Sequence, residues 1–583
     1  MKWKANICAL LCMLLLCQSA MAISAPMDIT CFSFDEPGSW DYVDGEFADG
    51  PLAFAREEPF AMSMYYDASG EPVDIGSAYQ AGDYAFSCGL GIIEQDGKFG
   101  YIDVDGNTVI DCIYDACSPF SEGLASVEKD GENLVIDLTG KTVFNMSQRQ
   151  MRAYSFSEGL CPVMSTADDE SWGLVGYMDH FGDLVIPLQF QSIHAFQKNG
   201  TAIVDRYVGD QVLSGVVDRT GKQVLPLEYK YVYNNYINYI LAEDEDETIL
   251  YDRAGTVLLS LPASEYDSAY LVEDCGLLIV EKNYRYGCLD LEGNVVIPLT
   301  YNYVSYIGDG LFSASLPLDH WGVIDKGGNT VVQFTNEFSD AGYSFSEGLL
   351  PAERNESGLA GYIDTTGAWV IEPQFEYAQS FKNGYAFVKQ NGSLGLLKNP
   401  TDLPSAWAQR EVEAARELGI LSALTDSCYT CSMNRLRFAE LMVSLVEHAA
   451  GAEPDAAEVI PFSDTADIFA RKAYVAGIVN GIGDGTTFSP DGTLTREQLA
   501  TMLCRAVRYI EGETGETVLP ASADLTGYTD ADQISDWAAD SMAVLNAAGI
   551  LQGTSGTTLS PKDTTTVEQA ILLTLRAYQE FIA

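Results

Sequence analysis

The stretch FSEGLASVEKDGENLVIDLTG, residues 120–140, decides the fold because its parts recur along much of the chain. It begins with an aromatic residue and a tight turn, FSEG, and continues through two short strands to a D-x-x-G turn. Glycine supplies the positive φ that such turns need, so this pattern predicts an antiparallel hairpin. One hairpin cannot bury its own apolar face, so the unit depends on neighbouring copies.

The D-x-x-G turn occurs nine times between residues 67 and 367, at intervals of 34 to 42 residues. Such a period is typical of repeat proteins with one supersecondary unit per repeat. Three or four short strands per unit, rich in β-branched and aromatic residues, predict a mainly β repeat array over residues 60–398. A four-stranded unit of this length fits a propeller-like array, and an open or superhelical array of β-hairpins is the alternative.

The chain is strongly acidic, with a formal net charge of −52 from 32 basic and 84 acidic residues. Phosphates need Lys and Arg for neutralisation, so the balance argues against nucleic acid and against an anionic membrane surface as partners. We interpret the charge as a source of solubility and self-repulsion rather than as a cation-binding device. The EDEDE run at 243–247 is interpreted as a solvated loop.

Residues 1–22 have the pattern of a secretory signal peptide. Lys2 and Lys4 precede an apolar core, and the small-x-small sequence at 20–22 marks a cleavage site. No later run of about 18 apolar residues follows, so we expect no transmembrane anchor in the mature chain. Residues 23–59 then form a lead-in to the array.

The cysteines are scattered, and Cys428 and Cys431 form the one C-x-x-C pair in the mature chain. The chain has four histidines and no second C-x-x-C, so a zinc site lacks ligands, and a local disulfide or buried thiols are expected. Two acidic turns, at 103–107 and 484–486, have features of calcium loops, but turn chemistry explains both without an ion. We therefore predict no metal site and no cofactor.

Three segments of the array, at 98–110, 320–332 and 360–392, resemble the WG-containing repeat family of bacterial, often surface-exposed, proteins. Trp321 keeps the name-giving pair in register, and Phe99, Tyr286 and Ala360 stand in elsewhere. The resemblance implies a β-repeat scaffold and no particular enzyme activity. Because residues repeated in every unit are best explained by the fold, specificity is expected where copies differ, as near 168–173 and 205–209.

Helical periodicity replaces the strand pattern over residues 399–583. The segments 462–507 and 528–578 are two copies of one unit that resembles S-layer homology (SLH) domains, and a weaker first copy precedes them. The predicted repeats span about 401–450, 460–510 and 526–580. The family implies a three-pronged helical module that binds pyruvylated secondary cell-wall polysaccharide or, in some bacteria, peptidoglycan.

The family's Thr-Arg-x-Glu/Gln signature stands at 495–498, where Arg496 would bind a ketal carboxylate in a bidentate manner. Arg435 aligns with it in the first repeat and Val567 in the third, so at most two anionic-sugar pockets are expected. The predicted polymer-binding residues are Arg435, Arg496, Glu497, Asp464, Asp530, Trp407 and Trp537. The alternatives are core packing for the two tryptophans, and for Arg496 a helix-start residue paired with a carboxylate.

No catalytic constellation stands out in the sequence, which lacks a nucleophile elbow, an H-E-x-x-H motif and a phosphate loop. We therefore expect a secreted, non-enzymatic surface protein whose helical module is anchored to cell-wall polymer. Its β-repeat array would display a surface for an unidentified protein or glycan ligand. The alternative is an anchored glycan-processing enzyme with two carboxylates facing one cleft of the array.

Overall fold

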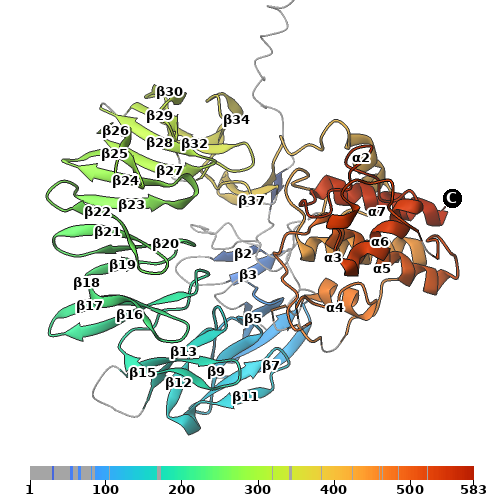
Figure 1. Ribbon diagram of the computed structural model, residues 1–583, viewed down its shortest axis with the longest axis horizontal. Helices are drawn as coiled ribbons and strands as arrows, with labels where there is room; N and C mark the ends of the chain where they lie inside the picture. Colours follow the sequence, from blue (N-terminus) through green and yellow to red (C-terminus); the bar gives the residue numbers. More distant parts are fainter. Residues whose placement is uncertain are drawn as a thin grey trace, which may run out of the picture. The chain divides into compact units, whose positions relative to one another are not determined.

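The computed structural model describes four short strands within residues 29–81 and most of residues 86–582 (Figure 1). Short gaps fall at 104–105, 167–172, 318–319, 341–343, 383, 423–424, 458–459, 463, 466, 484 and 522. The predicted signal peptide, the first D-x-x-G turn at 67–70 and much of the insert near 168–173 lie outside the described residues. The chain divides into two compact units, residues 38–228 with 402–583, and residues 1–37 with 229–401.

The repeat array consists of antiparallel sheets in which successive strands are neighbours, each up to seven or eight residues long. In residues 38–228 the first sheet contains β2 (Ala53–Arg56), β3 (Ser63–Tyr66), β4 (Gln80–Ala81), β5 (Leu90–Gln95), β6 (Lys98–Asp103) and β7 (Thr108–Tyr114). The second contains β8 (Ala116–Cys117), β9 (Leu124–Lys129), β10 (Glu132–Asp137) and β11 (Thr142–Asn145), and is followed by the 3-10 turn η1 (Ser147–Arg149). The third and fourth contain β12 (Met151–Ala153), β13 (Leu160–Ser165), β14 (Val175–Asp179), β15 (Leu184–Phe190), and then β16 (Thr201–Val208), β17 (Gln211–Asp218), β18 (Gln223–Tyr229).

The second unit continues the same pattern through five more sheets. They contain β19 (Tyr231–Tyr233), β20 (Tyr239–Glu243), β21 (Glu247–Asp252), β22 (Val257–Pro262); β23 (Ser268–Val272), β24 (Leu277–Lys282), β25 (Arg285–Asp290), β26 (Val295–Tyr301); β27 (Tyr303–Gly308), β28 (Leu311–Leu316), β29 (His320–Asp325), β30 (Thr330–Thr335); β31 (Phe338–Asp340), β32 (Leu350–Arg354), β33 (Leu359–Ile363), β34 (Trp369–Phe375); and β35 (Tyr377–Ala378), β36 (Tyr385–Gln390), β37 (Ser393–Lys398). The 3-10 turn η2 (Glu273–Cys275) joins β23 to β24. The early strand β1 (Ile29–Cys31) pairs antiparallel with β37 and so covers the edge of the last sheet.

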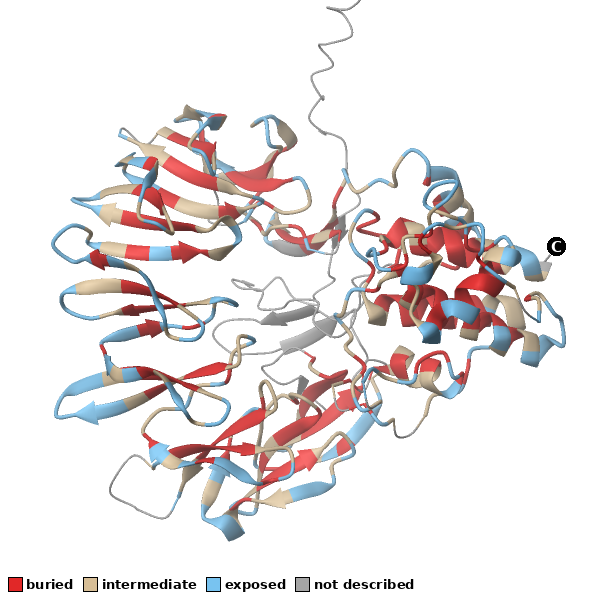
Figure 2. Ribbon diagram, viewed as in Figure 1, coloured by how far each residue is buried: buried red, intermediate tan, exposed pale blue. Residues whose placement is uncertain are grey.

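The mainly β repeat array predicted from the sequence is confirmed, as is the helical module after it. Hydrophobic clusters form between successive sheets, such as the one that Ile279, Cys288 and Ile297 build with Val304 and Phe312. Figure 2 shows buried residues running along the strands of the array and along the helices of the module. A single sheet thus obtains its core from the next repeat.

The FSEG element is a tight turn that also connects neighbouring repeats. Glu122 and Gly123 both have positive φ, 53° and 77°, between the bridged residues Ser121 and Leu124, the geometry of a type I′ turn. The Ser121 hydroxyl donates to the carbonyl of Phe156 in the next FSEG turn at 2.7 Å. Ser87 and Ser157 make the same bond to Phe120 and Phe196.

The aromatic residue of FSEG packs against the previous repeat. The rings of Tyr101 and Phe120 lie 4.7 Å apart, and the Tyr101 hydroxyl donates to the Ser118 carbonyl at 2.8 Å. Tyr362 repeats this arrangement with Phe381 and the carbonyl of Gln379. The recurring Tyr and Phe of the sequence are therefore parts of the junction between repeats.

The D-x-x-G turns have one hydrogen-bond pattern in all eight copies that the structure describes. The glycine amide donates to the Asp carbonyl, and the amide four residues after the Asp donates to its carboxylate, as Lys141 does to Asp137 at 3.1 Å. Gly140 has a φ of +79°, which completes the turn. Asp103 belongs to this set through the amide of Asn107, so turn chemistry accounts for its carboxylate.

The glycine after the aromatic position of the WG pattern marks a β-bulge. The register of β25 against β26 shifts between Tyr286 and Cys288, across Gly287, and a Cβ at Gly287 would lie 2.5 Å from the carbonyl oxygen of Ile297. Tyr286 pairs with Tyr301 in the same register as Trp321 pairs with Thr335. Tyr286 therefore occupies the tryptophan position of the WG pattern, as the sequence predicted. The pattern therefore encodes a close approach of two backbones.

The helical module lies in residues 402–583. Its helices are α2 (Gln409–Glu417), α3 (Arg435–Ala450), α4 (Ile468–Val475), α5 (Arg496–Thr514), α6 (Asp536–Ala547) and α7 (Val567–Ile582), with the 3-10 turn η3 (Ala531–Gln533) before α6. Its core includes residues from all six helices, such as Val412, Phe438, Leu503, Leu545 and Leu573. Within the part of the chain that the structure describes, no helix is long and apolar enough to cross a membrane.

Candidate functional site

Three loops of the helical module are joined by a closed triangle of backbone hydrogen bonds. The Met433 amide donates to the Thr565 carbonyl at 2.8 Å, the Thr565 amide to Leu494 at 3.0 Å, and the Leu494 amide to Met433 at 2.9 Å. Each of these residues stands two positions before the start of a long helix, α3, α5 or α7. The module therefore contains three equivalent segments arranged in a ring.

Each long helix begins against a turn of another segment. The first helical amides of Arg435, Arg496 and Val567 donate to the carbonyls of Gly492, Asp563 and Cys431, respectively, at 2.9 to 3.0 Å. Arg435 and Arg496 thus occupy the same position in two segments and Val567 in the third, as the sequence alignment predicted. The region 402–450, the weaker copy in the sequence, carries the same junctions as the other two.

Arg496 is a buried cation with unused hydrogen-bonding capacity. Its side chain is 8% exposed, and one terminal nitrogen donates to the Gln552 carbonyl at 2.6 Å. Its Nε has no hydrogen-bond partner among the described residues. Burial lowers the pKa of Arg496, as does the nearby Arg576.

Arg435 is in a similar state in the first segment. Its Nε is also buried without a partner in the described part of the chain, and one terminal nitrogen lies 3.9 Å from the sulfur of Met502. Burial lowers its pKa, the carboxylate of Asp464 opposes that shift, and Arg505 adds to it. A buried donor left unpaired costs about 1–3 kcal/mol. Both guanidinium groups are thus suited to an anionic acceptor from outside the chain.

The alternative for Arg496, a helix-start residue paired with a carboxylate, agrees with the structure in its first part only. The residue does begin α5, where Thr495 and Gln498 form a capping box. Among the ion pairs that involve described residues, however, neither Arg496 nor Arg435 has a carboxylate partner.

Glu497 binds the chain itself. It is 3% exposed and accepts hydrogen bonds from the amide and hydroxyl of Ser535, at 2.9 and 3.0 Å, and from Lys562 at 2.6 Å. Glu568 holds Ser405 in the same way one segment further on. These carboxylates fix the segments that lead into α6 and α2, and polymer binding by Glu497 stays a prediction.

Asp464 and Asp530 also hold loops. Asp464 accepts from the amides of Phe488 and Ser489 at 2.7 and 2.6 Å, and Asp530 accepts from Leu559 and Ser560. Burial opposes the ionisation of Asp530, but these backbone bonds outweigh it and lower its pKa. The predicted groove-lining carboxylates therefore shape the turns beside the helix starts.

Trp407 and Trp537 are exposed, so core packing, the alternative considered for them, is wrong. Their side chains are 54% and 56% exposed, and each stands two residues after the serine that a buried Glu holds. Glu497, which follows Arg496, binds Ser535, so this contact brings the Arg496 and Trp537 segments together. A flat aromatic surface then accompanies a buried cation at the junction of two segments.

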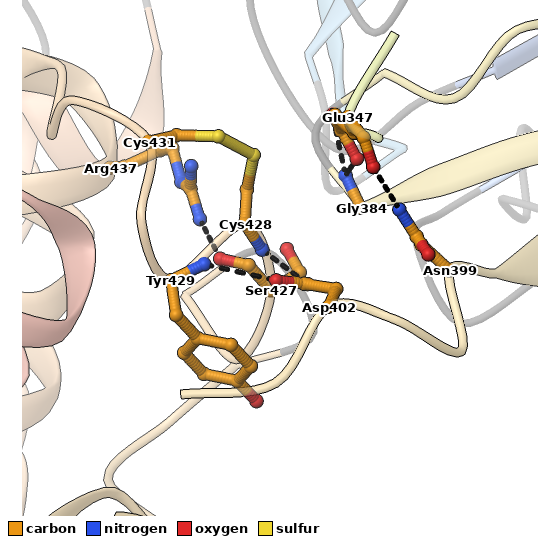
Figure 3. The surroundings of a disulfide bond; sticks show 9 residues. All are labelled: Glu347, Gly384, Asn399, Asp402, Ser427, Cys428, Tyr429, Cys431 and Arg437. Carbon is orange, nitrogen blue, oxygen red and sulfur yellow. Dashed lines mark hydrogen bonds between the residues drawn. A yellow bond between two sulfur atoms is a disulfide. The ribbon is translucent and has the colours of Figure 1, made fainter. Parts of the chain in front are cut away.

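Cys428 and Cys431 form a disulfide, one of the two states expected from the sequence. The turn that contains it is equivalent to the turns formed by SPDG at 489–492 and SPKD at 560–563 in the other two segments. Cys428 has a positive φ, as Ser489 and Ser560 do. Figure 3 shows the Asp402 carboxylate at the Cys428 and Tyr429 amides, and the Arg437 side chain at the Ser427 carbonyl. The sequence drew attention to the cysteines but not to Asp402, which a comparison with Asp464 and Asp530 could have found.

Family comparisons agree with both resemblances. The model described as "WG containing repeat" matches residues 99–132, 176–205, 215–245, 286–315, 321–356 and 361–393. The model described as "S-layer homology domain" matches residues 461–500 and 527–571. The chain therefore carries WG-containing repeats and SLH domains, which supports anchoring at the cell surface through cell-wall polysaccharide. The first of the three predicted SLH repeats, at about 401–450, is not matched and stays a prediction.

Three relatives share parts of the chain. The exoglucanase XynX of Acetivibrio thermocellus is 25% identical over 261 residues, 43% of this chain and 21% of that protein. An amylopullulanase of Thermoanaerobacterium thermosulfurigenes is 27% identical over 30% of this chain and 9% of its own length. An endoglucanase of Bacillus sp. (strain KSM-635) is 34% identical over 17% of this chain and 10% of its own length. The chain thus spans about a fifth or less of these relatives.

Solved structures are similar at low identity. A eukaryotic initiation factor aligns with 60% of this chain and 99% of its own at 12% identity and a TM-score of 0.36. BamB from Moraxella catarrhalis aligns with 56% of this chain and 93% of its own, at 9% identity and a TM-score of 0.26. The C-terminal WD40 domain of Sif2 aligns with 48% and 94%, at 10% identity and a TM-score of 0.26.

Proposed function

Because the chain carries WG-containing repeats and SLH domains, we propose that it is a non-enzymatic surface protein. Its helical module would bind secondary cell-wall polysaccharide or peptidoglycan, and its β-repeat array would present a binding surface. The observation that carries the anchor is the pair of arginines at two equivalent helix starts, Arg435 and Arg496, each with a buried Nε that has no partner among the described residues.

The chemistry favours an anionic sugar substituent as the ligand of these two arginines. A carboxylate accepts two parallel hydrogen bonds from one guanidinium group, and such charge-assisted bonds are roughly twice as strong as neutral ones. Exposed Trp537, next to the Arg496 junction, offers an apolar platform for a sugar ring. Val567 has no donor at the third helix start, so two pockets are expected rather than three.

Retention of the full chain on purified cell-wall sacculi tests the anchor. We expect the Arg435→Ala/Arg496→Ala variant to lose retention, and each single variant to weaken it. Arg508→Ala is the matched control, because Arg508 lies on the same helix α5, is exposed, and pairs with Asp540. Thermal unfolding of each variant shows whether the module still folds.

Two further arms define the ligand. Arg496→Lys keeps the charge but removes the bidentate geometry, so it should bind more weakly than the natural chain. Sacculi treated with mild acid to hydrolyse ketals should retain less protein if a pyruvyl ketal is the acceptor. An unmodified chain that fails to bind sacculi, or folded arginine variants that bind as well as it does, would refute the anchor.

The enzyme alternative rests on the names of the relatives, an exoglucanase, an amylopullulanase and an endoglucanase. It predicts release of reducing sugar from cell-wall or plant glycans by the full chain. Our proposal predicts no turnover, and turnover that is abolished by replacing one array carboxylate would overturn it.

A further inference from the structure

Three consecutive sheets of the array expose tyrosines on their first strands. Tyr231 on β19, Tyr270 on β23 and Tyr303 on β27 are 52%, 57% and 50% exposed. Tyr233, also on β19, is 37% exposed. On these three strands, which the structure describes throughout, every exposed hydrophobic side chain is a tyrosine.

The strand registers place each tyrosine on the same face of its own sheet. Val232, Ala269 and Val304 are buried and pair with Ala242, Val280 and Ala314. Each tyrosine is next to one of these buried residues, and side chains alternate between faces along a strand, so the tyrosines lie on the other face. That face packs on the next sheet through residues such as Leu241 and Ile279, and the tyrosines are exposed on its edge strand.

The tyrosines of neighbouring sheets come close to one another. The rings of Tyr286, on β25, and Tyr303 lie 6.0 Å apart. Burial and, to a smaller extent, the neighbouring Tyr270 raise the pKa of Tyr286. Burial is also the main cause of the raised pKa of Tyr233, to which Tyr270 and Tyr231 contribute. We call these five residues, Tyr231, Tyr233, Tyr270, Tyr286 and Tyr303, the tyrosine row.

The fold itself does not require aromatic side chains at these positions. Residues equivalent to Tyr231 by strand register are Ala116 in the second sheet and Arg152 in the third. The residue equivalent to Tyr233 in the second sheet is Ser118. Tyr377 holds the Tyr231 position in the last sheet, whereas small or charged residues hold it elsewhere, so the fold accepts a tyrosine here without requiring one.

Carboxylates accompany the row. Tyr231 is paired across the strands with Glu243, and Tyr286 with Glu281. Burial raises the pKa of Glu243, opposed by Lys230. Burial, and then a hydrogen bond with Glu281, raise the pKa of Tyr286 to about 12, so its hydroxyl stays protonated near neutral pH. The surface therefore combines flat rings, neutral hydroxyl groups and hydrogen-bond acceptors.

We propose that the tyrosine row binds an uncharged, hydroxyl-rich polysaccharide along the β19, β23 and β27 strands. The apolar faces of successive sugar rings would stack on the tyrosine rings. Sugar hydroxyls would donate to Glu243 and Glu281 and exchange hydrogen bonds with the tyrosine hydroxyls. This inference rests on the proposed role of the array as a binding scaffold and does not require the cell-wall anchor.

The charge of the molecule selects this class of ligand over two others. An anionic polymer would meet the carboxylates beside the row on a chain with a net charge of −52. A second copy of this chain would be repelled for the same reason. Tyrosine is also enriched at protein–protein interfaces, so failure of every uncharged probe to retard the chain is the outcome that would favour a protein partner.

Affinity electrophoresis of the full chain tests the proposal, with soluble starch, hydroxyethyl cellulose and galactomannan as uncharged probes and polygalacturonate as the anionic one. We expect at least one uncharged polymer to retard the protein. The Tyr231→Ala/Tyr270→Ala/Tyr303→Ala variant should bind that polymer roughly tenfold or more weakly, because three stacking surfaces are lost. Phe181→Ala is the matched control, since Phe181 is an aromatic residue that is 84% exposed in the turn after β14, outside the row.

Each other outcome decides against the proposal. It is overturned if no uncharged probe retards the chain, if the triple variant binds as well as the Phe181→Ala control, or if polygalacturonate is the better ligand. Tyr303→Phe should keep most of the affinity, which separates ring stacking from loss of fold. Retention on sacculi, measured in parallel, depends on Arg435 and Arg496, so failure of the row and failure of the anchor are distinguishable.

Discussion

The acidic side chains of the sheets and the arginines of the helical module both recur at a fixed place in each repeat, but their hydrogen bonding differs. Asp137 accepts hydrogen bonds from the amides of Thr139 and Lys141 within its own turn, and Glu122 accepts from the Gly159 amide of the next repeat. Arg496, by contrast, is buried, and its Nε has no partner in the described residues. Recurrence alone therefore does not separate a structural residue from a binding residue, and an unpaired buried donor at a recurring position is what marks the two arginines as candidates.

The same test divides the module itself. Glu497 has all its partners within the chain, and Arg496, its neighbour, does not. Substitutions at the first should thus lower the free energy of unfolding, and substitutions at the second should lower binding. The predictions below follow this division, in order of decreasing effect on stability.

Glu497→Ala should have the largest effect on stability. It removes the acceptor of the Ser535 amide and hydroxyl and leaves Lys562 without its partner at a site where Glu497 is 3% exposed. Removing one member of a buried, hydrogen-bonded charge pair costs about 3–5 kcal/mol, and the exposure of Lys562 argues for the lower end. Urea unfolding of the full chain measures it, and Glu513→Ala, exposed on the same helix, should change little.

The disulfide should contribute less than Glu497. The variant Cys428→Ser/Cys431→Gly gives this turn the Ser and Gly that Ser489 and Gly492 provide in the second segment. The closed loop is short, so the loss is expected to be about 2 kcal/mol. The backbone bond from Val567 to the Cys431 carbonyl does not depend on sulfur and should persist. A larger loss, or a variant that no longer binds sacculi, would mean that the disulfide rather than the backbone triangle closes the ring.

A single D-x-x-G turn of the array should matter less again. Asp137→Ala removes bonds to the Thr139 and Lys141 amides, which water can replace because both amides lie at an exposed turn. The expected loss is about 1 kcal/mol. Asp111→Ala, on an exposed position of β7, is the control. A loss as large as that of Glu497→Ala would show that turns and helix junctions are equally critical.

Much of the array could be predicted from the sequence because its rules are local. The Gly of FSEG and of D-x-x-G must take positive φ, and this requirement is visible in any one copy. The bond from the Ser121 hydroxyl to Phe156 could not be predicted, since it joins residues 35 positions apart in a register that only packing sets. The tyrosine row was missed for the same reason, because its members come from three different sheets.

The site in the module was predicted in part. Arg435 and Arg496 are placed as the motif indicated, and Glu497, Asp464 and Asp530 accept hydrogen bonds from the chain itself, which the motif did not indicate. A carboxylate next to a binding motif can bind a ligand, or it can accept hydrogen bonds from the backbone amides at the start of a helix or turn. The sequence does not show which amides will lie beside it. The amides that decide it lie 24 to 38 residues away.

Trp537→Ala should have the smallest effect on stability and a clear effect on binding. The indole is 56% exposed, so its truncation should change the free energy of unfolding by less than about 0.5 kcal/mol. If the ring is a sugar platform, retention on sacculi should fall while the thermal midpoint stays the same. Val475→Ala serves as the control, since Val475 is exposed at the end of α4, which starts no segment of the backbone triangle. A variant with a lower thermal midpoint would show that Trp537, like Glu497, stabilises the fold. A variant that keeps both its stability and its retention would show that Trp537 does not bind the polymer and that the arginines are the binding groups.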